Sequence, residues 1–111
     1  MNSEFLFVYG LFRDSGNSLL KGTFCGRSTI EGKIYFVNEF YPGFVRTKGF
    51  KTHGDIYLID PSVFTELDEY EGDEYIRTKI TTENGVECWI YEYKHDISKF
   101  TGIKSGDWML R

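Results

Sequence analysis

Two short segments of this chain combine residue types that can do chemistry together. In the first, residues 9–13 (YGLFR), a glycine turn follows an apolar run, and bare backbone N–H groups there can converge on a carboxylate or a developing oxyanion. In the second, residues 67–72 (LDEYEG), Glu71 offers a carboxyl group that can serve as a base. Tyr75 and Arg77 follow closely behind it. The two segments together indicate an active site.

Each segment lies at the end of a predicted element of secondary structure. Residues 5–9 form a continuous apolar, aromatic run bounded by glycine, which predicts a strand that is buried on both faces. Asp60 and Pro61 predict the start of a helix, because the Asp side chain can cap free N–H groups and proline suits the first helical position. Gly72 ends this helix and places Glu71 in its last turn.

The surroundings predicted for Glu71 raise its pKa. The carboxyl end of a helix carries partial negative charge, which disfavours a second negative charge there. An aromatic pocket would add the cost of desolvation, and nearby acidic side chains act in the same direction. These acidic neighbours are Asp68, Glu69, Asp73 and Glu74. The alternative interpretation is a solvated carboxylate at a helix end, because acidic runs usually mark exposed faces.

Asn84 and Gly85 predict a two-residue hairpin, in which positions whose numbers sum to 169 face one another. In that register Arg77 lies opposite Glu92, so that it either pairs with this residue or neutralises the acidic cluster. We expect this structural role for Arg77 rather than contact with a substrate. The predicted aromatic core face combines Ile76, Thr78 and Ile80 with Tyr93, Tyr91 and Trp89. The opposite face carries Tyr75, Arg77 and Lys79.

The predicted elements are mostly strands in short succession, with one clear helix. We therefore expect an α+β protein built on a small mixed β-barrel, closed or nearly closed, with one main α-helix and short flanking helices. The chain has 111 residues, of which 18% are aromatic, enough for one core without metals or disulfides. Residues 1–111 are predicted to form a single domain.

Charge and cysteine content exclude several classes of partner and site. The net charge is −4, with Lys and Arg scattered and outnumbered, so we expect no nucleic-acid partner. Cys25 and Cys88 have no close Cys or His at metal-ligand spacing, which predicts buried free thiols and no metal site. No apolar stretch approaches membrane-spanning length, and the first residues lack the basic start of a signal peptide. The predicted location is the cytoplasm.

An ordered set of short motifs supports a more specific interpretation. The set runs through residues 9–12 (YGLF), 30–35 (IEGKIY), 41–43 (YPG), 53–57 (HGDIY), 67–72 (LDEYEG) and 106–108 (GDW). Together, in this order and in a short acidic chain, these motifs resemble the gamma-glutamylcyclotransferase-like family, which includes the gamma-glutamylamine cyclotransferases and AIG2-like proteins. The resemblance covers nearly the whole chain and implies the same fold.

The resemblance implies a reaction and a role for each matched residue. In this family the alpha-amine of a gamma-glutamyl amine or amide attacks its own gamma-carbonyl, which gives 5-oxoproline and a free amine without a cofactor. Glu71 matches the catalytic glutamate, as general base and then general acid. The residues that match the substrate loop are Tyr9, Gly10, Leu11 and Phe12. The family usually has Ser or Thr followed by Leu where this chain has Leu11 and Phe12, so a hydroxyl that could orient the substrate is lost.

Several interpretations stay open from the sequence alone. Tyr9 either packs in the core with a satisfied hydroxyl or borders the pocket, and Tyr75 is a further candidate for substrate contact. The protein is either a cyclotransferase acting on a small gamma-glutamyl substrate or a non-catalytic domain that binds small molecules on the same fold. A third hypothesis is an interaction module that uses exposed aromatic side chains. The sequence does not predict the oligomeric state or the leaving amine.

Overall fold

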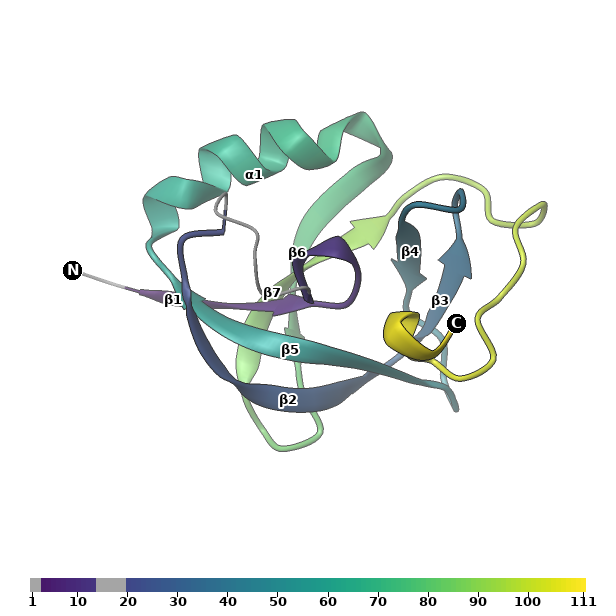
Figure 1. Cartoon of the computed structure of the whole chain (residues 1–111), viewed down its shortest axis with the longest axis horizontal. Coiled ribbons are helices and arrows are strands. Elements are labelled where there is room, and N and C mark those ends of the chain that lie inside the picture. Colours follow the sequence, from purple (N-terminus) through teal and green to yellow (C-terminus); the bar gives the residue numbers. More distant parts are fainter. Residues whose placement is uncertain (1–2, 14–19) are drawn as a thin grey trace.

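The computed structural model describes residues 3–13 and 20–111, and its centre is one strongly curled β-sheet with a helix along one side (Figure 1). The strands are β1 (Glu4–Val8), β2 (Thr23–Glu31), β3 (Lys33–Phe36), β4 (Pro42–Val45), β5 (Lys51–Ile59), β6 (Tyr75–Thr81) and β7 (Glu87–Tyr93). The helix is α1 (Phe64–Glu71). Short 3-10 helices are η1 (Leu11–Arg13), η2 (Pro61–Val63), η3 (Gly72–Glu74) and η4 (Trp108–Leu110).

The sheet is mixed, with the strand order β2-β5-β1-β7-β4-β3, and β6 pairs with β7 outside this path. β1 runs parallel to β7 and antiparallel to β5, so the N-terminal strand lies in the middle of the sheet. The sheet curls into a half-barrel, and α1 covers the side formed by β1 and β5 (Figure 1). The predicted α+β class, with a mixed curled sheet and one main helix, is confirmed.

β1 is buried on both faces from Leu6 to Val8, as its apolar run predicts, whereas Phe5 is 37% exposed. Leu6 and Val8 pack toward α1, in a cluster with Phe64 and Leu67. Phe7 enters a second cluster on the other side, together with residues such as Phe44, Ile90 and Trp108 of distant elements. Because both faces of β1 are packed, the turn that follows the strand is held in place from two directions.

The helix begins and ends where the sequence predicts. The Asp60 carboxylate accepts a hydrogen bond from the Ser62 N–H at 3.0 Å, and Pro61 starts the 3-10 turn that leads into α1. Gly72 ends α1 with a φ of +75°, a left-handed conformation that glycine adopts without strain. Glu71 is therefore the last residue of α1.

The predicted register of the β6–β7 hairpin is wrong by one residue. Facing positions sum to 168, since Thr81 pairs with Glu87 and Arg77 pairs with Tyr91. The loop has three residues between Thr82 and Val86, with Gly85 at a φ of +86°, and the Thr82 N–H donates to the Val86 carbonyl oxygen at 2.9 Å. A shift of one residue moves every side chain to the other face. Tyr75, Arg77 and Lys79 therefore share a face with Tyr93, Tyr91 and Trp89.

The two cysteines differ in their surroundings. Cys88 is a buried free thiol, as predicted, whereas Cys25 is exposed on β2, so the prediction is wrong for that residue. No cluster of three or more His, Cys, Asp or Glu residues able to hold a metal occurs within residues 3–13 and 20–111. Within the same ranges, no helix has the length and apolar character that crossing a membrane requires.

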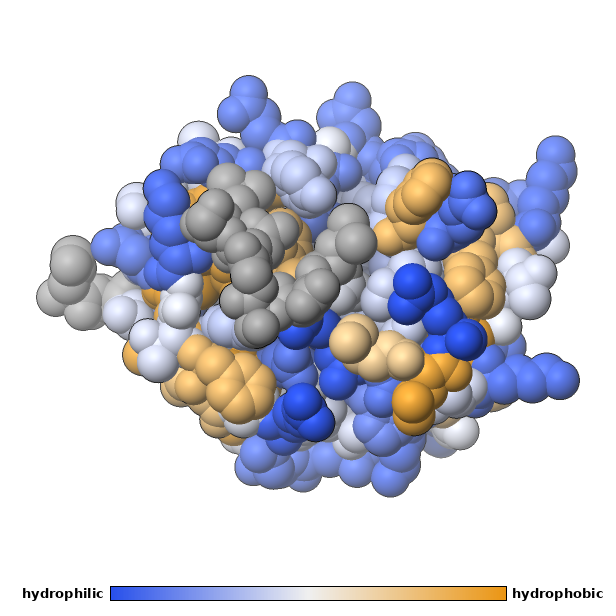
Figure 2. All heavy atoms as spheres, viewed as in Figure 1, coloured by the Kyte–Doolittle hydropathy of each residue, from blue (hydrophilic) through white to orange (hydrophobic). Residues whose placement is uncertain are grey.

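Exposed apolar side chains are spread over several elements. Figure 2 shows a largely hydrophilic face on which hydrophobic side chains gather in separate small patches. The exposed aromatic residues include Phe24 on β2, Phe40 before β4 and Phe50 before β5. Scattered exposed apolar side chains are normal on protein surfaces. This distribution gives the hypothesis of an aromatic interaction module no specific support.

Candidate active site

A cavity of about 250 Å³ lies where the end of β1, the start of β4 and the end of α1 meet. Among the residues predicted for the site, the structure brings Tyr9, Gly10, Phe12, Glu71 and Tyr75 to its wall. Leu11 is the first residue of η1, directly beside them, and Arg77 lies outside the wall. The described residues that line the wall are Phe7, Val8, Tyr9, Gly10, Phe12, Tyr41, Pro42, Tyr70, Glu71, Glu74, Tyr75 and Tyr91.

Gly10 is required by the close approach of another strand. A Cβ atom at this position would lie 2.8 Å from Cδ and 2.9 Å from Cγ of Pro42, at the start of β4. The Gly10 carbonyl oxygen accepts a hydrogen bond from the Arg13 N–H at 3.0 Å, which closes the turn into η1. The N–H groups at the start of such a turn are not used by the helix itself. The backbone at the cavity wall is thus tightly placed and rich in donors.

Tyr9 combines the two alternatives that the sequence left open. Its hydroxyl donates to the Tyr91 carbonyl oxygen at 2.6 Å and accepts from the Phe44 N–H at 3.1 Å. Burial raises the pKa of Tyr9 well above its ordinary value. Its one hydroxyl proton is therefore committed to β7, while the side chain also borders the cavity. Tyr9 shapes and fastens the wall, and it is not a proton donor toward the cavity.

Glu71 is the titratable group at the centre of this site. Burial against the aromatic wall raises the pKa of its carboxyl group to about 7, and the neighbouring Asp68 carboxylate adds to this rise. A carboxyl group with this pKa is present in both protonation states near neutral pH, so it can take up a proton and return it. The raised pKa was predicted from the helix end, the acidic neighbours and desolvation in an aromatic pocket, and burial is the largest cause.

Asp68 lies one helical turn before Glu71, and its pKa is shifted in the opposite direction, below its usual value. Arg77 holds it with two hydrogen bonds, Nε to Oδ1 at 2.9 Å and Nη2 to Oδ2 at 3.2 Å, and the Tyr91 hydroxyl donates to Oδ1 at 2.7 Å. Burial raises the pKa of Asp68, but these hydrogen bonds outweigh it and hold the pKa below its usual value. Arg77 therefore pairs with Asp68 of the acidic cluster, as one of the two predicted alternatives has it. The other alternative, pairing with Glu92, is wrong because of the hairpin register.

The guanidinium group of Arg77 is itself held by aromatic rings. Its Cζ lies 4.0 Å from the centroid of the Phe64 ring and 4.6 Å from that of Trp89. Such stacking on aromatic faces suits arginine and fixes the fork that holds Asp68. The Arg77–Asp68 pair thus forms a rigid support behind the last turn of α1.

Residues of β4 and η3 form the opposite wall of the cavity. The Tyr75 hydroxyl donates to the Pro42 carbonyl oxygen at 2.7 Å, and burial raises the pKa of Tyr75 well above its ordinary value. The Tyr41 hydroxyl donates to Oε1 of Glu74 at 3.2 Å. Sequence reasoning did not assign Tyr41 or Glu74 to the site, although Tyr41 belongs to a matched motif and Glu74 to the acidic cluster.

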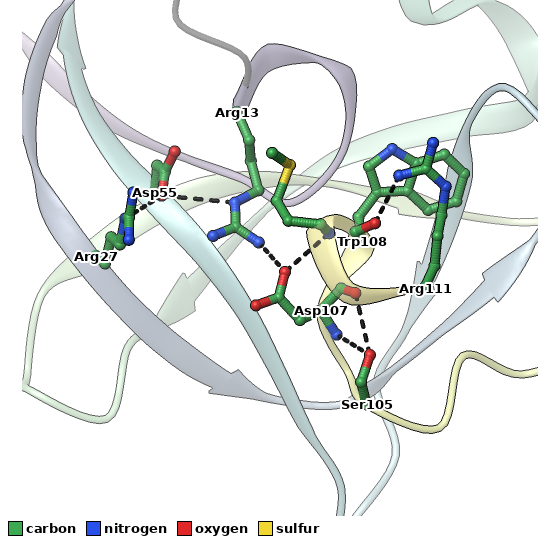
Figure 3. A network of polar contacts seen from close by, with 8 residues as sticks. Arg13, Arg27, Asp55, Ser105, Asp107, Trp108 and Arg111 are labelled. Atoms are coloured by element: carbon green, nitrogen blue, oxygen red, sulfur yellow. Dashed lines mark hydrogen bonds and ion pairs between the residues drawn. The ribbon is translucent and has the colours of Figure 1, made fainter.

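On the far side of the Gly10 turn, Arg13 enters a cluster of charges (Figure 3). Its Nη1 donates to Oδ1 of Asp107 at 2.5 Å, and its Nε lies 3.5 Å from Oδ1 of Asp55. The Arg13 and Asp55 side chains are each 6% exposed. Asp107 also accepts from the Met109 N–H at 2.9 Å, so the cluster ties the turn to β5 and to η4. Asp55 and Asp107 each lie in a matched motif and Arg13 closes the first segment, but no spacing in the sequence joins the three residues.

Comparison with known proteins places this geometry in context. Residues 6–110 match the sequence model of the family described as gamma-glutamyl cyclotransferase, AIG2-like. The chain is 35% identical over 111 residues to the gamma-glutamylcyclotransferase family protein ytfP of Citrobacter rodentium, and the alignment covers 96% of each chain.

Solved structures share the fold. The solution structure of ytfP from Escherichia coli has a TM-score of 0.75 at 35% identity, covering 95% of this chain and 96% of that one. The crystal structure of c4763, a protein of uropathogenic E. coli, has a TM-score of 0.87 at 18% identity, covering 99% and 95%, and shows likeness of fold alone.

Proposed function

Because the chain belongs to the gamma-glutamyl cyclotransferase, AIG2-like family, we propose that it cyclises a gamma-glutamyl amine or amide to 5-oxoproline and releases the amine. The observation that carries the proposal is Glu71, whose pKa is raised to about 7 in an aromatic cavity beside the Tyr9–Gly10 turn. The proposal includes a small-molecule substrate, no cofactor, no nucleic-acid or membrane partner, and a cytoplasmic location.

The proposed reaction begins with proton transfer. The alpha-amine of the substrate, with an ordinary pKa near ~8, is mostly protonated at neutral pH and is not nucleophilic until a base removes a proton. The Glu71 carboxylate takes that proton, and the free amine attacks the gamma-carbonyl carbon to form the new C–N bond. The attacking nitrogen loses its second proton as the ring amide forms. The bond to the leaving nitrogen breaks, and Glu71 relays the protons to the amine that departs.

The wall of the cavity supplies the remaining requirements of the reaction. Ring closure within one molecule is fast when the glutamyl chain is held in a folded pose, which the close walls at Gly10 and Pro42 favour. We assign the backbone N–H groups of residues 9–12 to the glutamyl end and to the oxyanion that develops on the gamma-carbonyl. Tyr75 fixes the Pro42 carbonyl at the other wall.

The departure from the family pattern falls on this wall and favours the second candidate function. Phe12 is buried, with its ring 5.5 Å from that of Tyr70, and Leu11 supplies no hydroxyl to a substrate. A hydrogen bond lost in this way costs on the order of 1 kcal/mol of binding. The second candidate is therefore a non-catalytic domain that binds the same class of small molecule.

The test is incubation of the purified protein with a panel of gamma-glutamyl amines and gamma-glutamyl amino acids, with 5-oxoproline measured by mass spectrometry. We expect product with the wild type. With Glu71→Gln the rate of product formation is expected to fall by about 100-fold or more, since a positioned general base contributes at least about this factor. Glu69→Gln is the matched control, because Glu69 is exposed and does not line the cavity. Binding of panel members without any product would establish the second candidate.

A further inference from the structure

The charges around the cavity are all of one sign. Within residues 3–13 and 20–111, Glu71 and Glu74 are the charged residues of its wall, and no Lys, Arg or His of these ranges belongs to it. Among the residues that the structure describes, neither carboxylate forms an ion pair, although nine such pairs occur elsewhere in that part of the chain. A cavity of this kind concentrates cations and repels anions.

The rest of the wall strengthens this preference. Aromatic rings line the same wall as the two carboxylates: Phe12 of η1, Tyr70 of α1, Tyr75 of β6, and Tyr41 just before β4. The faces of aromatic rings carry partial negative charge and attract ammonium groups, most strongly where water is partly excluded. The carboxylates and the ring faces thus both favour binding of a positively charged ligand.

Glu74 is held in place in the wall of the cavity. Its carboxylate accepts the Tyr41 hydroxyl at 3.2 Å, and its backbone carbonyl oxygen accepts from the Lys94 N–H at 3.0 Å. Glu74 is half-buried and no covalent or proton-transfer step in the proposed reaction uses it. Since the alpha-amine must lie at Glu71 to be deprotonated, the charge of Glu74 remains available to the other end of the substrate.

We propose that Glu74, supported by Tyr41, selects gamma-glutamyl substrates whose leaving amine carries a second positive charge, as in a diamine. This inference rests on the proposed cyclisation and names its substrate class. A leaving group that bears a carboxylate, as in a gamma-glutamyl amino acid, meets the Glu74 carboxylate and is disfavoured. The distal ammonium takes no part in bond making, so it adds binding to both the substrate and the transition state.

The first experiment measures binding, without the need for turnover. Three gamma-glutamyl amides with the same five-carbon leaving chain differ only at its end: those of 1,5-diaminopentane, pentylamine and 5-aminopentanoic acid. In the Glu71→Gln variant, calorimetry is expected to give the tightest binding for the diamine, about tenfold weaker binding for pentylamine, and the weakest for the acid. Equal affinities for the three would overturn the proposal.

The second experiment assigns the selectivity to Glu74. Adding Glu74→Gln to the Glu71→Gln background is expected to lower the ratio of diamine to pentylamine affinity about tenfold, whereas adding Glu69→Gln leaves it unchanged. An equal loss for all three ligands would show that Glu74 holds the glutamyl part, and the proposal would be wrong. If Glu74→Gln disturbs folding, as seen by thermal melting, Tyr41→Phe replaces it and is expected to lower the same ratio by a smaller factor.

Turnover separates the two proposals. If no ligand of the series gives 5-oxoproline with the wild type but the diamine binds best, the cyclisation is wrong and the charge preference stands. If all three are cyclised at equal kcat/KM, the cyclisation stands and the preference for a charged leaving amine is wrong. The expected result is product from all three ligands, with kcat/KM in the order of the affinities.

Discussion

Carboxylates lie on both sides of the turn at Gly10, and the two sides differ in how their charge is balanced. On one side, Asp55 and Asp107 face Arg13, which is almost fully buried between them. On the other side, Glu71 and Glu74 share the cavity wall with aromatic rings, and the described part of the chain adds no basic residue to that wall. Carboxylates paired with a buried cation typically have a structural role. Partly buried carboxylates without such a partner reduce stability and are typical of catalytic and binding sites.

Even in the cluster around Arg13, the positive charges do not fully compensate the burial of Asp55. Burial raises the pKa of Asp55, and Arg13 and Arg27 offset only part of this rise. Among the residues that the structure describes, Nε of Arg13 and Oδ1 of Asp55 are buried without a hydrogen-bond partner, and the distance between these two atoms is 3.5 Å. The cluster therefore depends on Arg13 remaining in place, and its removal would leave two carboxylates without a close buried cation.

The largest expected effect is the loss of stability in Arg13→Met. The variant keeps a long apolar stem but leaves Asp55 and Asp107 uncompensated, which is expected to lower the free energy of unfolding by about 3 kcal/mol. Urea denaturation at pH 7 measures it. Arg27→Met is the control, because Arg27 lies 3.7 Å from Asp55 with its side chain 78% exposed, and a change below about 1 kcal/mol is expected. Similar losses in the two variants would contradict a structural role specific to Arg13.

The next effect tests the turn that separates the two sides. In Gly10→Ala the new Cβ atom meets the ring of Pro42, so the backbone of the turn has to shift. A displacement of about 1 Å in the wall is expected to lower turnover about 100-fold. The double variant Gly10→Ala with Pro42→Ala removes the atoms that the Cβ meets and is expected to recover most of the rate. Absence of recovery would mean that the close contact is not the cause.

The third effect is the loss of stability that the partly buried Glu71 carboxylate causes when it is ionised. The folded-state pKa of Glu71, about 7, lies above its ordinary value of 4.5, so the folded protein binds a proton more tightly than the unfolded chain. The contribution of the Glu71 carboxyl group to the free energy of unfolding is fully present below pH 4.5 and is lost as the pH rises through about 7. Glu71→Gln cannot ionise, and at pH 8 it is expected to unfold with a free energy higher than that of the wild type by on the order of 2 kcal/mol.

Denaturation at pH 4.5 and pH 8 measures this effect. The difference between Glu71→Gln and the wild type should shrink toward zero at pH 4.5, where the wild-type carboxyl group is protonated. Glu69→Gln should show no such trend, because Glu69 is exposed to solvent in both states. A stabilisation of Glu71→Gln that is independent of pH would contradict the assigned pKa.

The parts of the fold that local signals determine could be predicted from the sequence. The apolar run of β1, the Asp60–Pro61 start of the helix and its end at Gly72 act over a few residues, and each is present in the structure. Glu71 could be placed in the last turn of α1 for the same reason. The direction of its pKa shift could be predicted from the helix end, the acidic neighbours and an expected aromatic pocket, and burial is its main cause.

The features that depend on distant pairings could not be predicted. The tip of the β6–β7 hairpin forms a three-residue loop, and this single extra residue moved Arg77 from Glu92 to Asp68. Tyr41, just before β4, and Glu74 of η3 are 33 positions apart and meet only in the folded chain. The Arg13–Asp107 contact joins residues 94 positions apart. Nothing in a local pattern specifies these contacts.

The smallest expected effect concerns two carboxylates of α1: Asp68, which is paired with Arg77, and Glu71, which is not paired with any described residue. Asp68→Asn removes a negative charge near Glu71 and lowers the pKa of Glu71, so the acidic limb of the kcat/KM profile should move to lower pH by less than about one unit. Arg77→Gln leaves the Asp68 carboxylate without its bidentate cation and should move the same limb to higher pH. Because both variants disturb the same ion pair, a purely structural effect would move the limb in one direction for both. Opposite shifts would therefore show that the charge of Asp68, and not only its packing, acts on Glu71.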